Sequence, residues 1–484
     1  MTSLKDRTTT AFIWRLFERG GNQVVALLVQ IVMARLLAPS DFGFLAILLV
    51  IINIGNTIVL SGLGNSLVQT ERADKLDFST VFWTMLTISA VMYALVFGLS
   101  PFISTFYDAP ILTETLRVLG LVFPLSAIES IQTAYVQRDL RFKTLFYATT
   151  ISTIVSGLIG VALAVSGKGL WSLVFQQITY HLANCIALAV QTRWIPAFSF
   201  SKKTARRHFS YGWKIMLPSL METFYDSLSD LLSGKHFGAN ELGLLSQGKK
   251  FPVAIDSMIT GTIQPVLLAA ISRAQNDISS VKSITKRTLK TSAFFVAPIM
   301  SCFALTAPQI ICILLGEQWL PAVPFLQAYC ISSALSSFHA INFESFNGVG
   351  RSDLFLKTKI ITVSYSIFFM LIAIYAFEDI HAVAATYAFS SVLSTFVNAF
   401  PNRKLIGYSY AEQIRDIFPS ITVAALSCLL VFPISNINLP PLLILLLQWL
   451  VFLLIYTLLS LIANKEQVLF LYHEIKNKLA KKAQ

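Results

Sequence analysis

Cationic side chains inside long apolar segments are the residues in this sequence with the clearest capacity for chemistry. Arg15 and Arg19 lie in the first apolar segment, Lys214 lies in a later one, and Lys249 and Lys250 lie in the next. An arginine can bind two phosphate oxygens at once through its planar fork, whereas a lysine offers a point charge. A charge at the centre of a lone membrane helix costs roughly 2.5–3.5 kcal/mol and needs a partner, water or a ligand. The pattern predicts a cavity that binds an anionic group.

Amides and carboxylates accompany these cations. Asn22 follows the two arginines and Asn53 lies in the second apolar segment, so we interpret both as further cavity residues. A partly desolvated carboxyl group can carry a proton, and such a group is a candidate for coupling transport to an ion gradient. The candidates for ion coupling are Glu222, Asp226, Asp256 and Glu129.

A simpler interpretation exists for two of the cations. Arg15 and Glu18 are three residues apart, so they can form an ion pair on one face of a helix. Lys214 can extend its ammonium group to the inner membrane surface while its stem stays in the apolar region. The sequence leaves both interpretations open.

The elements that must position these residues are membrane helices. Hydrophobic residues make up 55% of the 484 positions and charged residues only 13%, against roughly 25% charged in a soluble domain. The apolar residues form runs of about twenty, which cross a hydrocarbon core of roughly 30 Å. The sequence therefore predicts an all-α polytopic membrane protein of about fourteen transmembrane helices. The predicted spans are 11–33, 42–66, 78–103, 115–137, 146–166, 172–190, 209–232, 242–270, 289–315, 322–348, 356–377, 381–400, 416–434 and 439–463.

The basic residues indicate which side each connection faces. With alternating sides, one side holds 28 of the 37 Lys and Arg residues and the other holds only Arg35, Lys168 and Lys235. Short loops rich in Lys and Arg face the cytoplasm, so both termini are predicted to be cytoplasmic. The net charge of +12 then reflects topology rather than nucleic-acid binding. The longest inner connections, 191–208 and 271–288, are interpreted as solvated loops.

Enzymatic chemistry is not expected. No predicted outer segment exceeds about a dozen residues, so there is no room for an outer catalytic domain. The six histidines are scattered, and no catalytic or metal-ligand spacing is present. The five cysteines lie in apolar runs without a C-x-x-C pair, which indicates inert buried thiols. The sequence predicts a transporter that needs no cofactor or metal.

Two segments 200 residues apart resemble each other. In 34–45 (ARLLAPSDFGFL) and 234–245 (GKHFGANELGLL), the aligned pairs are Arg35 with Lys235, Asp41 with Glu241, Gly43 with Gly243, and Leu45 with Leu245. Each segment joins the first predicted helix of a half to the second, which indicates two parallel repeats of six helices with the substrate between them. The predicted domains are a six-helix lobe over 1–208, a six-helix lobe over 209–400, two appended helices over 401–463 and a basic cytoplasmic tail over 464–484.

Several motifs resemble a known family when taken in order. They are ARLLAPSDFGFLAI at 34–47, SGLGNSLVQ at 61–69, QRDLRFK at 137–143, GKGLWSLVFQQ at 167–177 and GANELGLLSQGKK at 238–250. The chain resembles Wzx-type polysaccharide and O-antigen flippases, in the branch of the colanic-acid exporter within the multidrug/oligosaccharidyl-lipid/polysaccharide exporter superfamily.

This resemblance implies two lobes around a cationic cavity in the bacterial plasma membrane. It implies that an undecaprenyl-diphosphate-linked oligosaccharide moves from the inner to the outer leaflet, beside the polymerase and glycosyltransferases of the same pathway. Arg15 and Arg19 match by position the arginines of the first helix that related flippases place near the diphosphate. Lys249 and Lys250 stand where those flippases have arginine, so the bidentate contact is missing there.

Two other functions remain as alternatives. A cation-coupled multidrug exporter of the same superfamily would favour isolated carboxylates and aromatics over several cavity cations. A membrane polymerase or ligase would need a long outer loop bearing His and Arg, and none is predicted.

Overall fold

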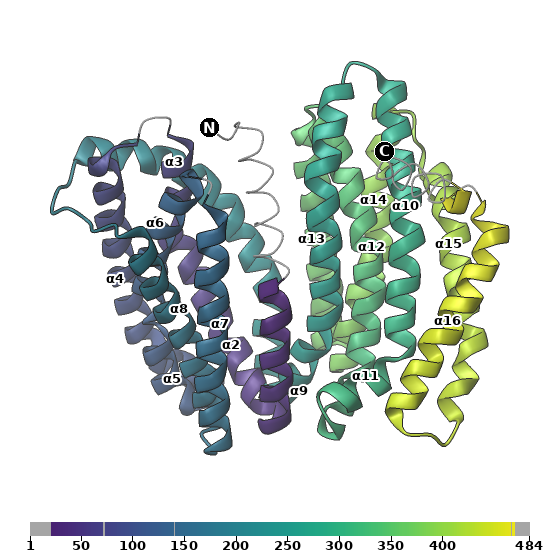
Figure 1. Ribbon diagram of the computed structural model, residues 1–484, viewed down its shortest axis with the longest axis horizontal. Coiled ribbons are helices and arrows are strands. Elements are labelled where there is room, and N and C mark those ends of the chain that lie inside the picture. The colour runs from purple at the N-terminus through teal and green to yellow at the C-terminus, as the bar shows by residue number, and fades with distance from the viewer. Residues whose placement is uncertain (1–20, 71–72, 140, 466, 470–484) are drawn as a thin grey trace, which may run out of the picture. The chain divides into compact units, whose positions relative to one another are not determined.

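The computed structural model describes residues 21–70, 73–139, 141–465 and 467–469, with only the backbone described at Glu222 and Ser352. Within these ranges the chain is helical and contains no strand. It divides into two compact units, Met1–Ser246 and Gln247–Gln484, and the boundary between them falls inside the longest helix. Figure 1 shows both units as bundles of long helices.

The first unit contains the helix over Gly21–Leu36 and most of the numbered helices up to α9. Their bounds are α2 (Pro39–Leu60), α3 (Leu63–Gln69), α4 (Lys75–Phe106), α5 (Ile111–Leu119), α6 (Val122–Arg138), α7 (Phe142–Val165), α8 (Leu170–Thr192) and the part of α9 (Lys202–Ala274) that precedes Gln247.

The second unit begins within α9 and ends with the Leu-rich helix α16. Its further elements are α10 (Ile278–Leu305), α11 (Ala307–Leu314), the 3₁₀ helix η1 (Glu317–Ala322), α12 (Val323–Gly348), α13 (Ser352–Tyr375), α14 (Ile380–Leu405), α15 (Tyr410–Val431), the 3₁₀ helix η2 (Phe432–Asn436) and α16 (Pro441–Ala463).

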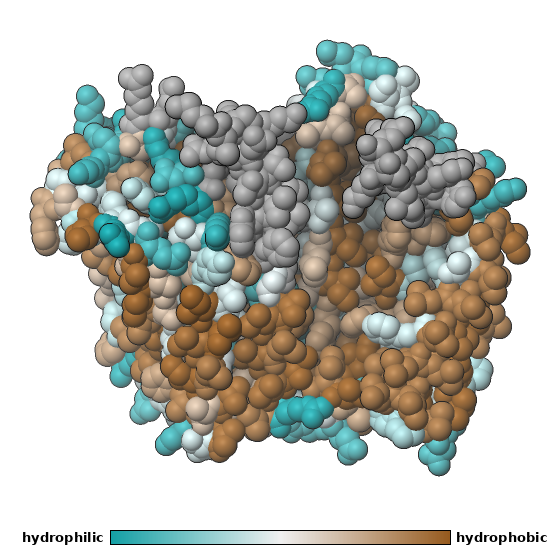
Figure 2. All heavy atoms as spheres, viewed as in Figure 1, coloured by the Kyte–Doolittle hydropathy of each residue, from teal (hydrophilic) through white to brown (hydrophobic). Residues whose placement is uncertain are grey.

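The apolar helices confirm the predicted fold class. Eleven helices of the described residues are long and apolar enough to cross a membrane. The number fourteen stays a prediction, because α9 covers two predicted spans, the predicted span 11–33 is only partly described, and α12 is not among the eleven. In each unit, apolar residues cover the middle of the visible surface and hydrophilic residues gather toward its ends (Figure 2).

The repeated segments pack against each other within the first unit. The helical path of α9 is interrupted at Gly238 (φ 84°, ψ 174°), the position 200 residues after Ala38, which caps the start of α2. A Cβ atom built on Gly43 would lie 1.7 Å from the Ala239 carbonyl oxygen, and one on Gly243 would lie 1.8 Å from the Pro39 carbonyl oxygen. Gly43 and Gly243 are equivalent positions of the two segments, and so are Pro39 and Ala239. Each glycine contacts the residue four positions before the other glycine, so the contact is reciprocal. It supports the repeat that the sequence predicts.

Two predicted spans contain breaks. The span 42–66 is divided into α2 and α3 at Ser61 and Gly62, which both have positive φ. Only a residue without Cβ fits at Gly62, because a Cβ there would lie 2.7 Å from the Gly212 carbonyl oxygen. The span 115–137 is similarly divided into α5 and α6.

The interpretation of 271–288 as a solvated loop is wrong. Helix α10 begins at Ile278, and the carboxylate of its N-cap residue Asp277 accepts hydrogen bonds from the Ser279 and Ser280 amides. Hydrogen bonds from Ser280 and Ser279 lower the pKa of Asp277 to about 2, so this cap stays ionised. The connection 191–208 is likewise helical from Lys202 onward.

The last two helices pack closely on α10. A buried cluster joins Ala297 of α10 to Val423 and Ala424 of α15 and to Phe452 of α16. The Tyr456 hydroxyl donates a hydrogen bond of 2.7 Å to the Phe294 carbonyl oxygen. Helices α15 and α16 therefore pack as part of the second unit, each with one face buried.

Candidate functional site

The predicted cationic residues are only partly within the described chain. Arg15 and Arg19 lie outside the described residues. Lys214 and Lys250 are exposed on α9, and Lys249 is half-buried. Lys214 belongs to the first unit, and the two neighbouring lysines belong to the second. Their role in binding an anionic substrate stays a prediction.

The two predicted asparagines differ in their surroundings. The half-buried Asn22 side-chain oxygen accepts a hydrogen bond of 2.6 Å from the Thr153 hydroxyl, which ties the first described helix to α7. Asn53 is exposed on α2, and its backbone carbonyl accepts a hydrogen bond of 2.9 Å from the Thr57 hydroxyl. Asn22 therefore has a packing partner, whereas the Asn53 side chain faces outward from its unit.

Glu129 is the predicted carboxylate with the most developed surroundings. Its Oε2 atom lies 2.9 Å from Nδ1 of His181, and its Oε1 atom accepts a hydrogen bond of 2.7 Å from Nδ2 of Asn184. The Glu129 and His181 side chains are each only 21% exposed. Helix α6 supplies the carboxylate and α8 supplies both partners, so the cluster lies within the first unit.

Asp256 has a partner within the second unit. Its Oδ2 atom accepts a hydrogen bond of 2.7 Å from the Ser336 hydroxyl of α12, and its buried Oδ1 atom accepts none from the described residues. Asp226 is exposed on α9 in the first unit, and the Glu222 side chain is not described. The role of all three carboxylates in ion coupling stays a prediction.

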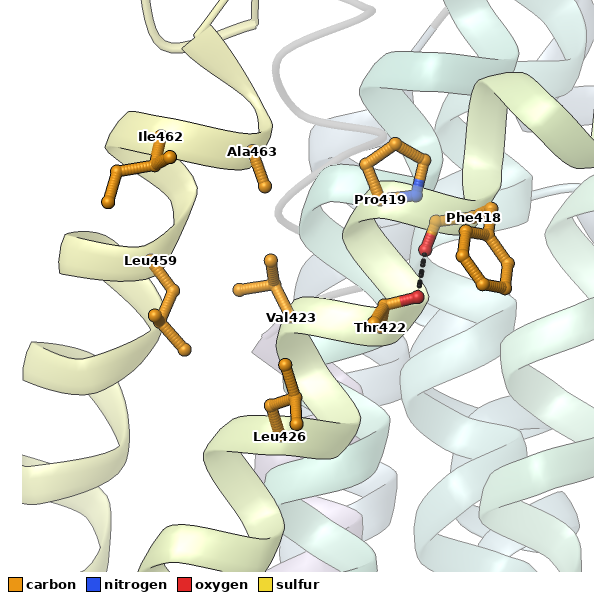
Figure 3. Close-up of a pocket in the computed structure, with 8 residues that line it drawn as sticks. All are labelled: Phe418, Pro419, Thr422, Val423, Leu426, Leu459, Ile462 and Ala463. Atoms are coloured by element: carbon orange, nitrogen blue, oxygen red, sulfur yellow. Dashed lines mark hydrogen bonds between the residues drawn. The ribbon is translucent and has the colours of Figure 1, made fainter.

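An apolar groove lies between α15 and α16 in the second unit (Figure 3). It has a volume of about 270 Å³ and is lined by Phe418, Pro419, Thr422, Val423, Leu426, Leu459, Ile462 and Ala463. The single hydroxyl group in this lining, that of Thr422, donates to the Phe418 carbonyl oxygen. None of the described residues that line the groove is charged.

Sequence reasoning missed His181, Asn184 and Ser336 as partners of the predicted carboxylates. Both His181 and Glu129 lie near the middle of predicted spans. Two ionisable residues at such depth could have suggested that they pair with each other. The pairing itself joins residues 52 positions apart, so it could not be read from spacing along the chain.

The helical architecture is that of a class of membrane transporters. The fold is similar to that of the lipid II flippase MurJ in an inward closed conformation, with a TM-score of 0.76 and 13% identity over 95% of this chain and 100% of the other. It is also similar to an inward-facing multidrug resistance transporter of the MATE family, with a TM-score of 0.66 and 12% identity over 80% and 94% of the two chains. At these identities the likeness establishes the fold.

The sequence defines the family within this class. A family model described as polysaccharide biosynthesis protein matches residues 32–324, so the chain belongs to that family. It is 24% identical to the succinoglycan biosynthesis transport protein ExoT of Rhizobium meliloti, over 70% of this chain and 68% of that protein. It is 22% identical to the lipopolysaccharide biosynthesis protein WzxC of Escherichia coli, over 86% and 85% of the two chains.

A third relative is the teichuronic acid biosynthesis protein TuaB of Bacillus subtilis, which is 22% identical over 77% of this chain and 78% of that protein. These relatives confirm the predicted family resemblance and the prediction of a multi-pass membrane transporter rather than an enzyme.

Proposed function

We propose that this protein is a flippase that moves lipid-linked oligosaccharide repeat units from the inner to the outer leaflet of the bacterial plasma membrane. The units are carried on undecaprenyl diphosphate and serve the synthesis of lipopolysaccharide, capsule or exopolysaccharide. The main support for this proposal is that the chain belongs to the polysaccharide biosynthesis protein family. Its fold is also similar to that of a lipid II flippase.

The cations on the membrane helices support an anionic substrate. Lys214, Lys249 and Lys250 lie on α9 among apolar residues, and a cation within a membrane helix needs a counter-charge, water or a ligand. We assign them, with Arg15 and Arg19, to the cavity that receives the diphosphate, because a diphosphate neutralises several cations at once. Asn22 and Asn53 are assigned to the same route.

The two lobes, 1–208 and 209–400, would alternate access to this cavity. Such motion needs an energy source, and Glu222, Asp226, Asp256 and Glu129 are the carboxylates assigned to ion coupling. The pathway's polymerase and glycosyltransferases would act before and after the flipping step, with both termini in the cytoplasm.

Deletion of the gene tests the proposal. The expected result is loss of surface polysaccharide together with accumulation of lipid-linked repeat units on the inner leaflet, and analysis of the accumulated sugars names the glycan. Unchanged surface polysaccharide, combined with lost resistance to cationic drugs, would favour the multidrug exporter instead.

Point variants test the cavity assignment. Arg19→Ala and Lys249→Ala should reduce surface polysaccharide at matched protein levels, because each removes a cation from the proposed diphosphate site. Lys203→Ala removes an exposed lysine near the start of α9 and serves as the control. Normal polysaccharide in both cavity variants would contradict the assignment.

A further inference from the structure

An ionisable pair lies near the middle of two apolar helices of the first unit. Glu129 is inside α6 and His181 is close to the middle of α8. Their atoms Oε2 and Nδ1 lie 2.9 Å apart, and both side chains are 21% exposed. Ionisable residues at such depth are costly to insert, and in membrane transporters they are typical of proton routes.

The hydrogen bond decides where a proton can be added. An ionised Glu129 carboxylate can only accept a hydrogen bond, so beside it a neutral His181 carries its proton on Nδ1 and donates a hydrogen bond to Glu129. The Nε2 atom is then the basic nitrogen of the ring. In this state the pair has a net charge of −1, and addition of a proton at Nε2 gives an imidazolium–carboxylate pair with no net charge. A pair without net charge is less costly to bury.

We propose that Glu129 and His181 form the proton-binding site that couples transport to the proton gradient. The proton binds at Nε2 of His181, is held as the imidazolium by Glu129, and is released after the conformational change. No oxidation or group transfer is involved, since one proton is bound and the same proton is released. This inference rests on the proposed function and names the coupling ion.

Two buried acceptors beside the pair support a hydrated or proton-carrying site. Asn184 is 1% exposed, and its Nδ2 group donates a hydrogen bond to Glu129. Its Oδ1 atom has no hydrogen-bond partner among the described residues. Gln132 is 4% exposed, lies three residues after Glu129 on the same helix, and its Oε1 atom also has no such partner. Buried acceptors of this kind are usually satisfied by ordered water.

Other ionisable groups near the pair can be named for the part of the chain that the structure describes. Two are neighbours on α8: the Tyr180 ring lies 5.3 Å from the His181 ring, and Cys185 donates to the Leu125 carbonyl oxygen. Among the helices whose contacts are described, α2, α3, α4, α5 and α7 pack against α6 or α8. The titratable residues of these elements and of α6 itself are Asp41, Lys75, Asp77, Tyr93, Glu114, Arg117, Tyr135, Arg138, Lys143 and Tyr147.

Three of the charged residues on these helices, Asp77, Arg117 and Asp41, have partners other than His181. Asp77 forms an ion pair with Arg207, and Arg117 donates to the Ser100 hydroxyl. Asp41 accepts a hydrogen bond from the Ala38 amide at the start of α2. Glu129 is therefore the carboxylate that neutralises a protonated His181.

A direct titration tests proton binding without reference to transport. The full-length protein, labelled with ¹⁵N-histidine and placed in lipid nanodiscs, is followed by NMR as the pH is lowered. His181→Gln assigns the His181 signal by its disappearance. The expected result is that this ring binds a proton as the pH is lowered, and that Glu129→Gln reduces this proton binding. A His181 ring that keeps one protonation state throughout the titration would overturn the proposal.

Export in cells then tests coupling. His181→Gln and Glu129→Gln should lose surface polysaccharide at matched protein levels, and Glu129→Asp, which keeps the carboxylate, should restore part of it. His236→Gln, an exposed histidine of the first unit, is the matched control. A purely structural role predicts instead that the variants lower protein levels while the export per molecule keeps its dependence on the proton gradient.

Two further outcomes separate the hypotheses. Wild-type export that follows a sodium gradient and ignores the proton gradient would overturn the proton site. If deletion of the gene leaves surface polysaccharide unchanged while His181 still titrates with Glu129, the flippase function fails and the proton site survives.

Discussion

At the scale of single residues, Asp416 shows how a nearly buried carboxylate is neutralised in the second unit. Its side chain is 9% exposed, and its two oxygens lie 3.3 Å from Nζ of Lys286 and 3.4 Å from Nζ of Lys290. The Tyr408 hydroxyl donates a third contact of 2.7 Å. Burial, followed by the bond to Asp416, raises the pKa of Tyr408, so this hydroxyl keeps its proton and continues to donate. The cluster joins α10 to α15.

We expect Asp416→Asn to destabilise the second unit by roughly 1–3 kcal/mol, because both lysines lose their counter-charge while the shape is preserved. The measurement is thermal unfolding of the purified protein in detergent. Asp353→Asn is the control, since Asp353 forms an exposed pair with Arg351. Equal melting temperatures for the Asp416 variant and the wild type would contradict a stabilising role.

At the scale of elements, the crossing of α2 with the second part of α9 depends on two glycines. Gly43 and Gly243 let the two backbones touch, and Pro39 and Ala239 begin the two helices at equivalent positions of the repeat. A side chain at either glycine would meet a backbone carbonyl, which moves only if the helix moves. The contact therefore depends on both repeats having glycine at the same position.

Gly43→Ala and Gly243→Ala should each destabilise the first unit by roughly 1–3 kcal/mol, the usual cost of overpacking. Melting of the purified protein measures the effect. Gly98→Ala is the matched control, because a Cβ at Gly98 of α4 would meet nothing within 4 Å. Alanine tolerated at all three positions would show that the crossing is not a close contact.

At the scale of the whole molecule, the basic residues make a prediction about orientation. Lys235 lies in a predicted outer segment and Lys203 in a predicted inner one, and both are exposed. In a chain whose five cysteines have been replaced, Lys235→Cys should react with a membrane-impermeant thiol reagent added to intact cells. Lys203→Cys should react only after the cells are opened. The reverse pattern would invert the predicted topology.

The family and the helical fold could be predicted from the sequence, but little of the candidate site's geometry could; the two six-helix repeats stay a prediction. Glu129 could be singled out because a carboxylate within an apolar run is conspicuous, yet its partner His181 comes from another helix. The cations Arg15 and Arg19 remain known from the sequence alone. Helix breaks such as Gly62 were missed because hydropathy averages over the few residues at which a backbone changes direction.

The sequence by itself determined that apolar helices cross a membrane and which ends of them carry basic residues. Both properties are local. Whether a segment enters the membrane depends on its own apolar side chains, and the side that a loop faces depends on its own basic residues. Only the tertiary structure decided that Glu129 meets His181 and Asn184, and that Gly43 meets Ala239. Such contacts join residues far apart in the chain, and their distances follow from how whole helices pack. The cationic residues in the apolar segments suggest an anionic substrate, and the packed helices add the carboxylate–histidine pair that we propose binds a proton.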